Sequence, residues 1–333
     1  METMEKMDQA SLYYLEKAPV SKSIMHMVIP MMLSFMVTII YNITDAFFIG
    51  KLDNTAMMAS VTLALAFSCL LMALGHLFGV GAGTYVSRLL GEGNSESAKK
   101  VCSINFWSSI LTGIIFMALC LPLLSPLLQL LGAKGDTLLY TRNYILVFVI
   151  GAPFVIANLS LEETVRAEGA STASMIGLIS GVVVNIILDP IFIFLLHLDI
   201  TGAALASVLG NIVSVVWFIY YLQKKSTVQS VAIKDFKPSQ EIYKTILKVG
   251  ISAFLLDGFM VITTLLFNHY SMLYGNSVVA GLGISQRVIQ IVEIKISAVQ
   301  PLAKIWPGQN NRIMLLYTHQ RIIQETDNIL AYI

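Results

Sequence analysis

The strongest constraint on this chain is a series of long apolar blocks, each close to the length that crosses a bilayer. A membrane-spanning helix needs about 20 apolar residues. Only 12% of the 333 residues are charged, whereas a soluble domain usually carries about 25%. The sequence therefore predicts an all-α polytopic membrane protein, because helices satisfy their own backbone hydrogen bonds in lipid. We expect eight spans, at residues 25–49, 56–86, 102–122, 138–160, 170–196, 201–222, 246–270 and 277–300.

The charges in the connecting loops predict the orientation of these spans. Cytoplasmic loops carry an excess of Lys and Arg. With a cytoplasmic N-terminus, the inside segments before the last span hold thirteen Lys and Arg, and the outside loops hold three. We therefore expect a multi-pass protein whose N-terminus is cytoplasmic. The net charge of +1 gives no reason to expect a nucleic-acid partner.

A weak internal repeat predicts the division of the chain into lobes. Residues 27–60 and 248–281 share a pattern, and six spans separate their starts. Parallel repeats of this kind are a transporter architecture. A complete second copy would need six spans where we count two, so we expect a shortened second lobe. The predicted segments are a cytoplasmic N-terminal segment (1–24), a six-helix lobe (25–223), a cytoplasmic inter-lobe linker (224–245), a two-helix partial second lobe (246–300) and an atypical polar tail (301–333).

Polar residues within the spans give the best indication of function. An acidic residue inside a membrane span is costly and is a functional-site hypothesis by default. Counting 1.5 Å of rise per residue, the first, fifth and sixth spans bring five polar side chains to a similar depth in the outer half of the bilayer. These are Tyr41, Asp45, Asn185, Asp189 and Ser207.

Two carboxylates and three neutral oxygens at one depth predict a cation site. Hard cations such as Na⁺ take oxygen ligands, and a carboxylate in a low dielectric also binds a proton. The alternative is structural: Asp45 would cap an extracellular helix end, and Asp189 would pair with a backbone amide before the kink at Pro190. No spacing of Cys or His predicts a further metal site, and we expect no cofactor beyond a coupling H⁺ or Na⁺.

Other charged residues lie at different depths. Asp257 falls near the middle of the seventh span and could attract a cationic ligand, carry a proton or pair with a nearby polar group. Glu162, Glu163, Arg166 and Glu168 flank a cytoplasmic turn, where we expect salt bridges rather than catalysis.

Small residues in the second span predict tight helix packing. "GHLFGVGAG" places Gly75, Gly79 and Gly83 on one helix face. Small residues at this spacing let membrane helices approach closely. The stretch contains no Lys that would suit a phosphate-binding loop.

Several of these stretches together carry a family likeness. The chain contains "YNITDAFFIG", "RAEGASTASMIG", "NIILDPIFI" and "TGAALAS", in an order and spacing that resemble MATE (multidrug and toxic compound extrusion) transporters. The stretches "LYYLEKAPVSKSIMHMVIPMM" and "HLFGVGAGTYVSRLLG" are most similar to the MepA-like branch. The likeness covers about residues 11–293.

The resemblance implies a twelve-helix fold of two six-helix lobes that extrudes organic cations against an inward H⁺ or Na⁺ gradient. It also implies cation ligands from the first, fifth and sixth helices, at Tyr41 and Asp45, Asn185 and Asp189, and Ser207. Some relatives place an acid on the seventh helix, where Asp257 stands. We therefore expect a secondary active multidrug efflux antiporter of the bacterial plasma membrane, monomeric, associated with antibiotic resistance and not an enzyme.

Three alternatives remain at this point. A shortened chain could be a non-functional or regulatory half-transporter. A flippase of lipid-linked oligosaccharides would need cationic residues lining its cavity, and spans one to seven hold no Lys or Arg near their centres. An intramembrane enzyme could use the two carboxylates as an aspartyl protease does, but no "GxGD" occurs in the spans.

Overall fold

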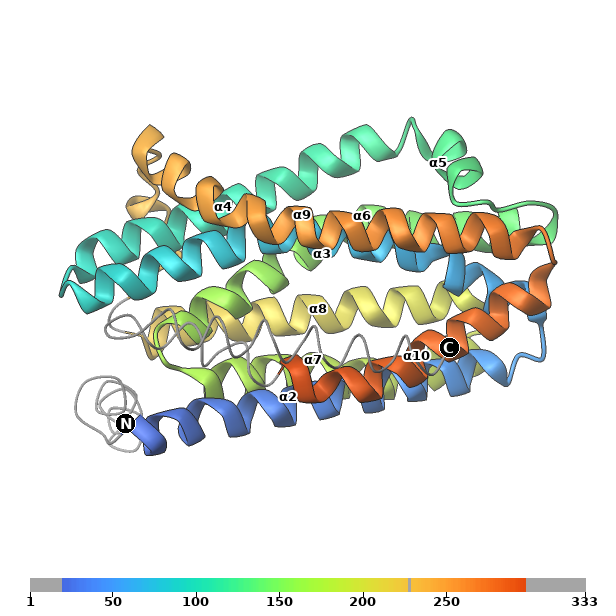
Figure 1. Cartoon of the computed structure of the whole chain (residues 1–333), viewed down its shortest axis with the longest axis horizontal. Helices are drawn as coiled ribbons and strands as arrows, with labels where there is room; N and C mark the ends of the chain where they lie inside the picture. The colour runs from blue at the N-terminus through green and yellow to red at the C-terminus, as the bar shows by residue number, and fades with distance from the viewer. Residues whose placement is uncertain (1–19, 227–228, 298–333) are drawn as a thin grey trace, which may run out of the picture.

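The structure is a computed structural model that describes residues 20–226 and 229–297, and this part of the chain is helical throughout, without a strand. The all-α expectation is confirmed. The elements are α2 (Val20–Gly50), α3 (Thr55–Gly91), α4 (Ser95–Cys120), α5 (Leu124–Leu130), α6 (Asp136–Ala167), α7 (Ser171–Pro190), the π-helix η1 (Ile191–Leu195), α8 (Asp199–Lys224), the short 3-10 helix η2 (Ile233–Asp235), α9 (Gln240–Met272) and α10 (Asn276–Ser297). The long helices lie roughly along one axis (Figure 1).

Seven helices of the described part are long and apolar enough to cross a membrane: α2, α3, α4, α6, α7 continued through η1, α8 and α9. They coincide with the first seven predicted spans. The eighth, predicted at 277–300, coincides with α10, a helix of 22 residues that is not among the seven. The predicted tail at 301–333 and most of the N-terminal segment at 1–24 lie outside the described residues.

Local sequence accounts for several helix boundaries. The Asn54 side chain accepts a hydrogen bond from the backbone N–H of Ala56 at 2.9 Å and caps α3. Asn94 caps α4 in the same way through the N–H of Ser97, at 3.1 Å. Asparagine is a favoured N-cap because its side-chain oxygen satisfies a free amide of the first turn. The seven-residue helix α5 was not predicted, because its apolar run is too short to show a period.

One face of α3 packs tightly against α6 through the predicted glycines. A Cβ added at Gly75 would lie 2.7 Å from the Leu159 Cβ, and one at Gly79 would lie 2.9 Å from the Ser160 Cα. At Gly83 the nearest atom would be the Glu163 carbonyl oxygen, at 3.1 Å. The expected close packing is confirmed, and its partner is α6.

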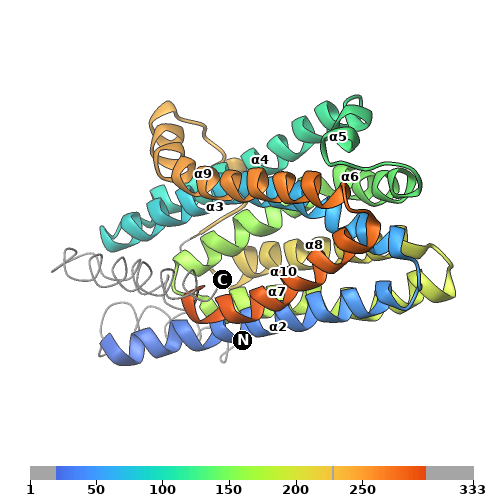
Figure 2. The same cartoon turned by 45° about the vertical axis from the view of Figure 1, so that its right-hand side comes forward.

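Another face of α3 packs against α9. A Cβ added at Gly81 would lie 2.2 Å from the Ile246 carbonyl oxygen, and one at Gly250 would lie 1.8 Å from the Leu77 carbonyl oxygen. Only glycine fits at either position. Both views show α9 running beside α3 (Figures 1 and 2). Helix α3 is therefore the centre of the bundle and joins α6 to α9.

The segment before α9 is attached to the bundle. In the predicted linker, at 224–245, Gln229 Nε2 donates to the Thr164 carbonyl oxygen at 2.8 Å, and Trp107 Nε1 donates to the Val231 carbonyl oxygen at 3.2 Å. Gln229 and Val231 are buried. This part of the linker is packed onto α4 and α6.

Candidate functional site

The predicted cation site lies where α2, α7 and α8 meet. Helices α7 and α8 approach closely because Gly181 and Gly210 face each other: a Cβ added at Gly181 would lie 2.6 Å from the Gly210 carbonyl oxygen. One turn above Gly181, Asn185 faces α8, and its Cβ is 3.3 Å from the position of a Cβ added at Gly210. The glycine contact thus brings the polar face of α7 onto that of α8.

Four of the predicted residues form a continuous hydrogen-bonded set. The Tyr41 hydroxyl and Ser207 Oγ are 3.0 Å apart. Asn185 Nδ2 donates to Ser207 Oγ at 3.3 Å and to Asp189 Oδ1 at 3.4 Å. Helices far apart in the sequence therefore present their oxygens to one small volume. We call Tyr41, Asp45, Asn185, Asp189 and Ser207 the acid cup.

Asp45 lies beside this set. It is close enough to interact electrostatically with the Asp189 carboxylate. Asp45 is 5% exposed and Asp189 is 0% exposed. Two carboxylates that interact away from water repel each other when both are ionised, so the pair favours a proton or a cation between them.

In the acid cup, Asp189 Oδ2 and Asn185 Oδ1 are buried without a hydrogen-bond partner. No described Lys, Arg or His forms an ion pair with Asp189. A buried polar atom is nearly always paired, so these orphan oxygens indicate a place for a ligand. Carboxylate, amide and hydroxyl oxygens are a donor set that fits a proton or a small hard cation.

Pro190 changes the helix directly after Asp189. Its ring has no N–H to donate to the carbonyl oxygen of Ile186, four residues earlier, which weakens the last turn of α7. The chain continues as the π-helix η1, which closes with the Leu196 N–H donating to the Ile191 carbonyl oxygen at 2.9 Å. Irregular turns of this kind are frequent at functional sites. The described hydrogen bond of Asp189 comes from the Asn185 side chain, not from a backbone amide as the structural alternative supposed.

Sequence reasoning missed an extension of the acid cup toward α6. Asn211 Nδ2 donates to the Ser207 carbonyl oxygen at 2.8 Å, and Asn211 Oδ1 accepts from Asn158 Nδ2 at 2.8 Å. The signal was present, because Asn211 lies one helical turn after Ser207 within an apolar span. Three polar residues in series therefore connect α8 to α6.

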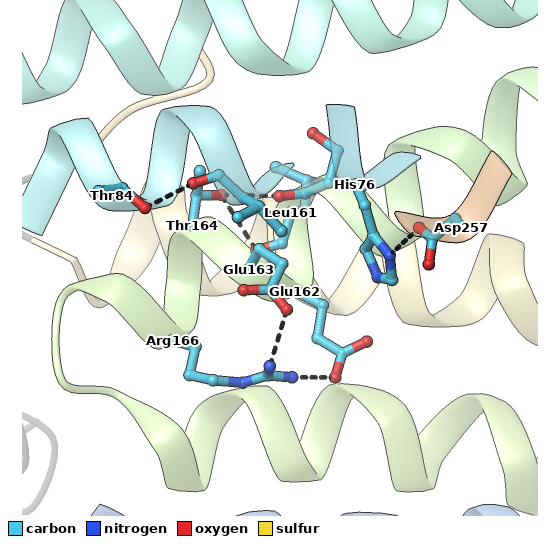
Figure 3. Close-up of polar contacts among 10 residues, drawn as sticks. His76, Thr84, Leu161, Glu162, Glu163, Thr164, Arg166 and Asp257 are labelled. Carbon is cyan, nitrogen blue, oxygen red and sulfur yellow. Dashed lines mark hydrogen bonds and ion pairs between the residues drawn. The ribbon is translucent and has the colours of Figure 1, made fainter. Parts of the chain in front are cut away.

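Asp257 lies outside the acid cup, on α9. Its Oδ2 is 2.8 Å from His76 Nδ1 on α3 (Figure 3). Asp257 is 8% exposed. Of the alternatives for this residue, the structure places it in a pair with a polar neighbour, and that neighbour is a histidine the sequence did not indicate.

The charged residues at the end of α6 form the expected salt bridges. Arg166 binds both Glu162 and Glu163, the latter at 2.9 Å from its Nη1 (Figure 3). Ser226 Oγ donates to Glu168 Oε2 at 2.7 Å. The first three side chains are largely buried. The prediction of a salt-bridged turn is confirmed, although the ion pairs lie within the last turns of the helix.

In the described part of the chain, an all-helical bundle with seven helices long and apolar enough to cross a membrane, and with buried acids at helix contacts, has the architecture of a polytopic membrane protein. The MatE family model matches residues 30–191. The multidrug export protein MepA of Staphylococcus aureus (strain NCTC 8325 / PS 47) is 43% identical over 288 residues, which are 86% of this chain and 64% of that protein. The MepA of Staphylococcus haemolyticus (strain JCSC1435) is 41% identical over the same length.

Solved structures agree with this assignment. A MOP-superfamily transporter from Pyrococcus furiosus aligns with a TM-score of 0.79 and 28% identity, over 89% of this chain and 65% of that one. A multidrug-resistance MATE transporter in its outward-facing conformation gives a TM-score of 0.78 at 28% identity, with the same shares covered. The chain is similar to MATE-family proteins, and to MepA in particular, as the sequence motifs predicted. These relatives are transporters and not enzymes. The chain spans less than two thirds of the length of the relatives it matches.

Proposed function

We propose that this protein is a secondary active antiporter that exports organic cations in exchange for inward H⁺ or Na⁺. The observation that carries the proposal is the pair of orphan oxygens in the acid cup. Asp189 Oδ2 and Asn185 Oδ1 are buried among Tyr41, Asp45 and Ser207 without a hydrogen-bond partner. A proton or Na⁺ bound there would interact with these two oxygens. It would also reduce the repulsion between the carboxylates of Asp45 and Asp189. The names of the relatives, multidrug export proteins, support export of drug-like substrates.

The acid cup would act through an equilibrium between two states of the bundle. A ligand shifts such an equilibrium only by its difference in affinity for the two states. Helices α2, α7 and α8 each supply oxygens to the cup, so a bound cation draws these three helices together. When the cation leaves, repulsion between Asp45 and Asp189 favours their separation. An organic cation bound elsewhere in the bundle would favour the state that the coupling ion disfavours, and this opposition produces exchange.

The same proposal covers location and organisation. The distribution of Lys and Arg supports a cytoplasmic N-terminus, and the bacterial relatives support a plasma membrane location. Residues 25–223 would form one six-helix lobe, the linker at 224–245 would follow on the cytoplasmic side, and 246–300 would begin a second lobe. We propose that the transporter works as a monomer in the lipid bilayer.

Efflux of ethidium from cells that lack other multidrug pumps tests the proposal. Four proteins are compared: this chain, a chimera that adds the remaining C-terminal helices of the Staphylococcus aureus MepA, and each of the two with Asp189→Asn. The substitution keeps the size of the side chain and its hydrogen bond to Asn185, but it removes the charge. Asp53→Asn is the matched control, because Asp53 is exposed in the loop after α2.

We expect at least the chimera to expel ethidium, Asp189→Asn to stop efflux, and Asp53→Asn to have no effect. Equal efflux by the chimera with and without Asp189→Asn would remove the acid cup from the mechanism. Efflux by the chimera alone would show that the additional helices are needed for transport. No efflux by either unsubstituted protein would contradict the proposed function.

A further inference from the structure

The contact between His76 and Asp257 is unusual within the described residues. It joins two different helices, whereas the Arg88–Glu92 and Lys100–Glu96 pairs and the two pairs of Arg166 each link residues three or four positions apart. His76 Nδ1 and Asp257 Oδ2 are 2.8 Å apart. Charged side chains inside membrane spans are costly unless they are paired. The histidine is thus the internal partner of the acid on α9.

The surroundings of this pair are rich in carboxylates. Glu162 and Glu163 on α6 interact electrostatically with His76, and Arg166 pairs with both of them. With Asp257, the cluster holds three carboxylates, one guanidinium and one imidazole. Carboxylates on two helices, α6 and α9, therefore face His76, and they favour a positive charge at this place.

The backbone holds the pair in place independently of its charges. Gly250 lies seven residues before Asp257, about two helical turns, and its Cα faces the Leu77 carbonyl oxygen so closely that no Cβ fits. Next to it, Gly81 meets Ile246 in the same way. Helices α3 and α9 therefore stay together when the pair is weakened. A substitution at His76 should therefore change the group that contacts the Asp257 carboxylate more than it changes the packing of α3 against α9.

We propose that His76 is a specificity-determining residue that competes with cationic substrates for the Asp257 carboxylate. A substrate cation replaces the imidazole on Asp257, and His76 turns away. The proposal rests on the proposed export of organic cations and adds the residue that sets when the substrate is accepted. Imidazole is the side chain whose charge normally changes between pH 5 and 8. Protonated His76 holds Asp257 more strongly and repels a cation, so substrate binding weakens as the pH falls.

The other ionisable groups near the pair differ in the pH response that they predict. Besides the carboxylates and guanidinium on α6, the Cys69 thiol on α3 lies close enough to interact with Asp257. A thiol is neutral in the acidic half of this pH range, and the guanidinium keeps its charge throughout. Protonation of Glu162 or Glu163 would also weaken cation binding at low pH, and only a change at His76 separates that contribution.

Binding of ethidium, a permanent organic cation, to the purified chain tests the inference. Fluorescence polarisation would give the dissociation constant at pH 6 and pH 8 for the unchanged chain, His76→Gln and Asp257→Asn. Glutamine keeps a hydrogen-bond donor toward Asp257 but cannot become charged. The matched control is His269→Gln, because His269 is an exposed histidine of α9.

We expect the unchanged chain and His269→Gln to bind about fivefold more tightly at pH 8 than at pH 6, because neutral imidazole is the weaker competitor. At both pH values, the dissociation constant of His76→Gln should lie within about twofold of that of the unchanged chain at pH 8. The dissociation constant of Asp257→Asn should be about tenfold higher than that of the unchanged chain at both pH values. If His76→Gln keeps the pH response of the unchanged chain, or Asp257→Asn binds normally, the inference is wrong while the proposed function stands. If the unchanged chain does not bind ethidium at either pH, the inference is wrong, and ethidium efflux by the chimera decides the proposed function separately.

Discussion

Asp189 and Asp257 are both buried aspartates inside membrane-spanning helices, yet the side chains around the two carboxylates differ. Asp189 is surrounded by neutral oxygens and a second carboxylate, and its Oδ2 has no hydrogen-bond partner. Asp257 has a histidine 2.8 Å away. The chain therefore supplies a titratable partner for Asp257, whereas the described hydrogen-bond partner of Asp189 is the neutral amide of Asn185.

This difference indicates a division of labour. A buried acid without an internal counter-charge suits an ion that enters from solvent, because that ion meets no competing group. A buried acid with a titratable partner suits a ligand that must displace something, because the partner sets the threshold for binding. Coupling ion and organic cation would then use separate carboxylates on separate helix contacts.

The largest expected effect follows from removing the charge of Asp189. In a chain that expels ethidium, Asp189→Asn should reduce efflux driven by an imposed ion gradient to background, because the cup then has only one carboxylate. Asp257→Asn should leave measurable efflux at high ethidium concentration. The proposed difference between Asp189 and Asp257 is wrong if the two substitutions reduce the rate of efflux equally at saturating ethidium.

A smaller effect is expected from separating the helices that build the acid cup. A Cβ at Gly181 would lie 2.2 Å from Ser214 Oγ, so Gly181→Ala should lower the free energy of unfolding by about 1–3 kcal/mol through overpacking. Thermal unfolding of the purified chain measures this. Gly258→Ala is the control, because no atom lies within 4 Å of its added Cβ, and it should be neutral or slightly stabilising.

The same variant also separates the two sites. Gly181→Ala should weaken ion coupling while leaving the pH response of ethidium binding intact, since His76 and Asp257 lie on α3 and α9. A change in that pH response would show that the two sites are not independent.

A moderate effect is expected at Asp257 itself. In efflux kinetics, Asp257→Asn should raise the KM for ethidium about tenfold, the loss of one charge-assisted contact of roughly 1.5 kcal/mol. The kcat should change by less than about twofold, because the acid cup is untouched. A fall in kcat at constant KM would instead place Asp257 in ion coupling and would remove the division between the two acids.

The smallest effect should come from the neutral oxygens of the acid cup. Ser207→Ala removes the contacts with Tyr41 and Asn185, and Tyr41→Phe removes the first of these. Each should reduce stability or ion affinity by about 1 kcal/mol, the net value of a typical hydrogen bond. A double-mutant cycle would show less than additive loss if the two hydroxyls act together. Strict additivity would mean that the 3.0 Å contact contributes nothing.

Much of the fold follows from the sequence because lipid permits few alternatives. Apolar length predicted eight spans, of which the first seven coincide with helices long and apolar enough to cross a membrane. Three glycines in "GHLFGVGAG" predicted a tight helix contact. Helix α5 was missed because seven residues are too few to show a helical period. The packed linker was also missed, since Gln229 and Val231 are held by helices more than 60 residues away.

The acid cup was predicted because its geometry depends mainly on depth. Counting residues from the membrane surface places Tyr41, Asn185 and Ser207 at one level, and their contacts across α2, α7 and α8 agree with that count. The partner of Asp257 could not be predicted in this way. His76 lies 181 residues away, and which of several helices α9 packs against depends on shape, through Gly81 and Gly250.

Infrared spectroscopy of the purified chain tests the central claim most directly, because it observes the carboxyl groups themselves. The claim is that Asp189 binds the coupling ion in the acid cup. The unchanged chain should show a protonated carboxyl band that declines when the pH is raised or Na⁺ is added, and Asp189→Asn should remove that band, whereas Asp53→Asn should keep it. An identical ion-dependent band in the unchanged chain and in Asp189→Asn would contradict the account.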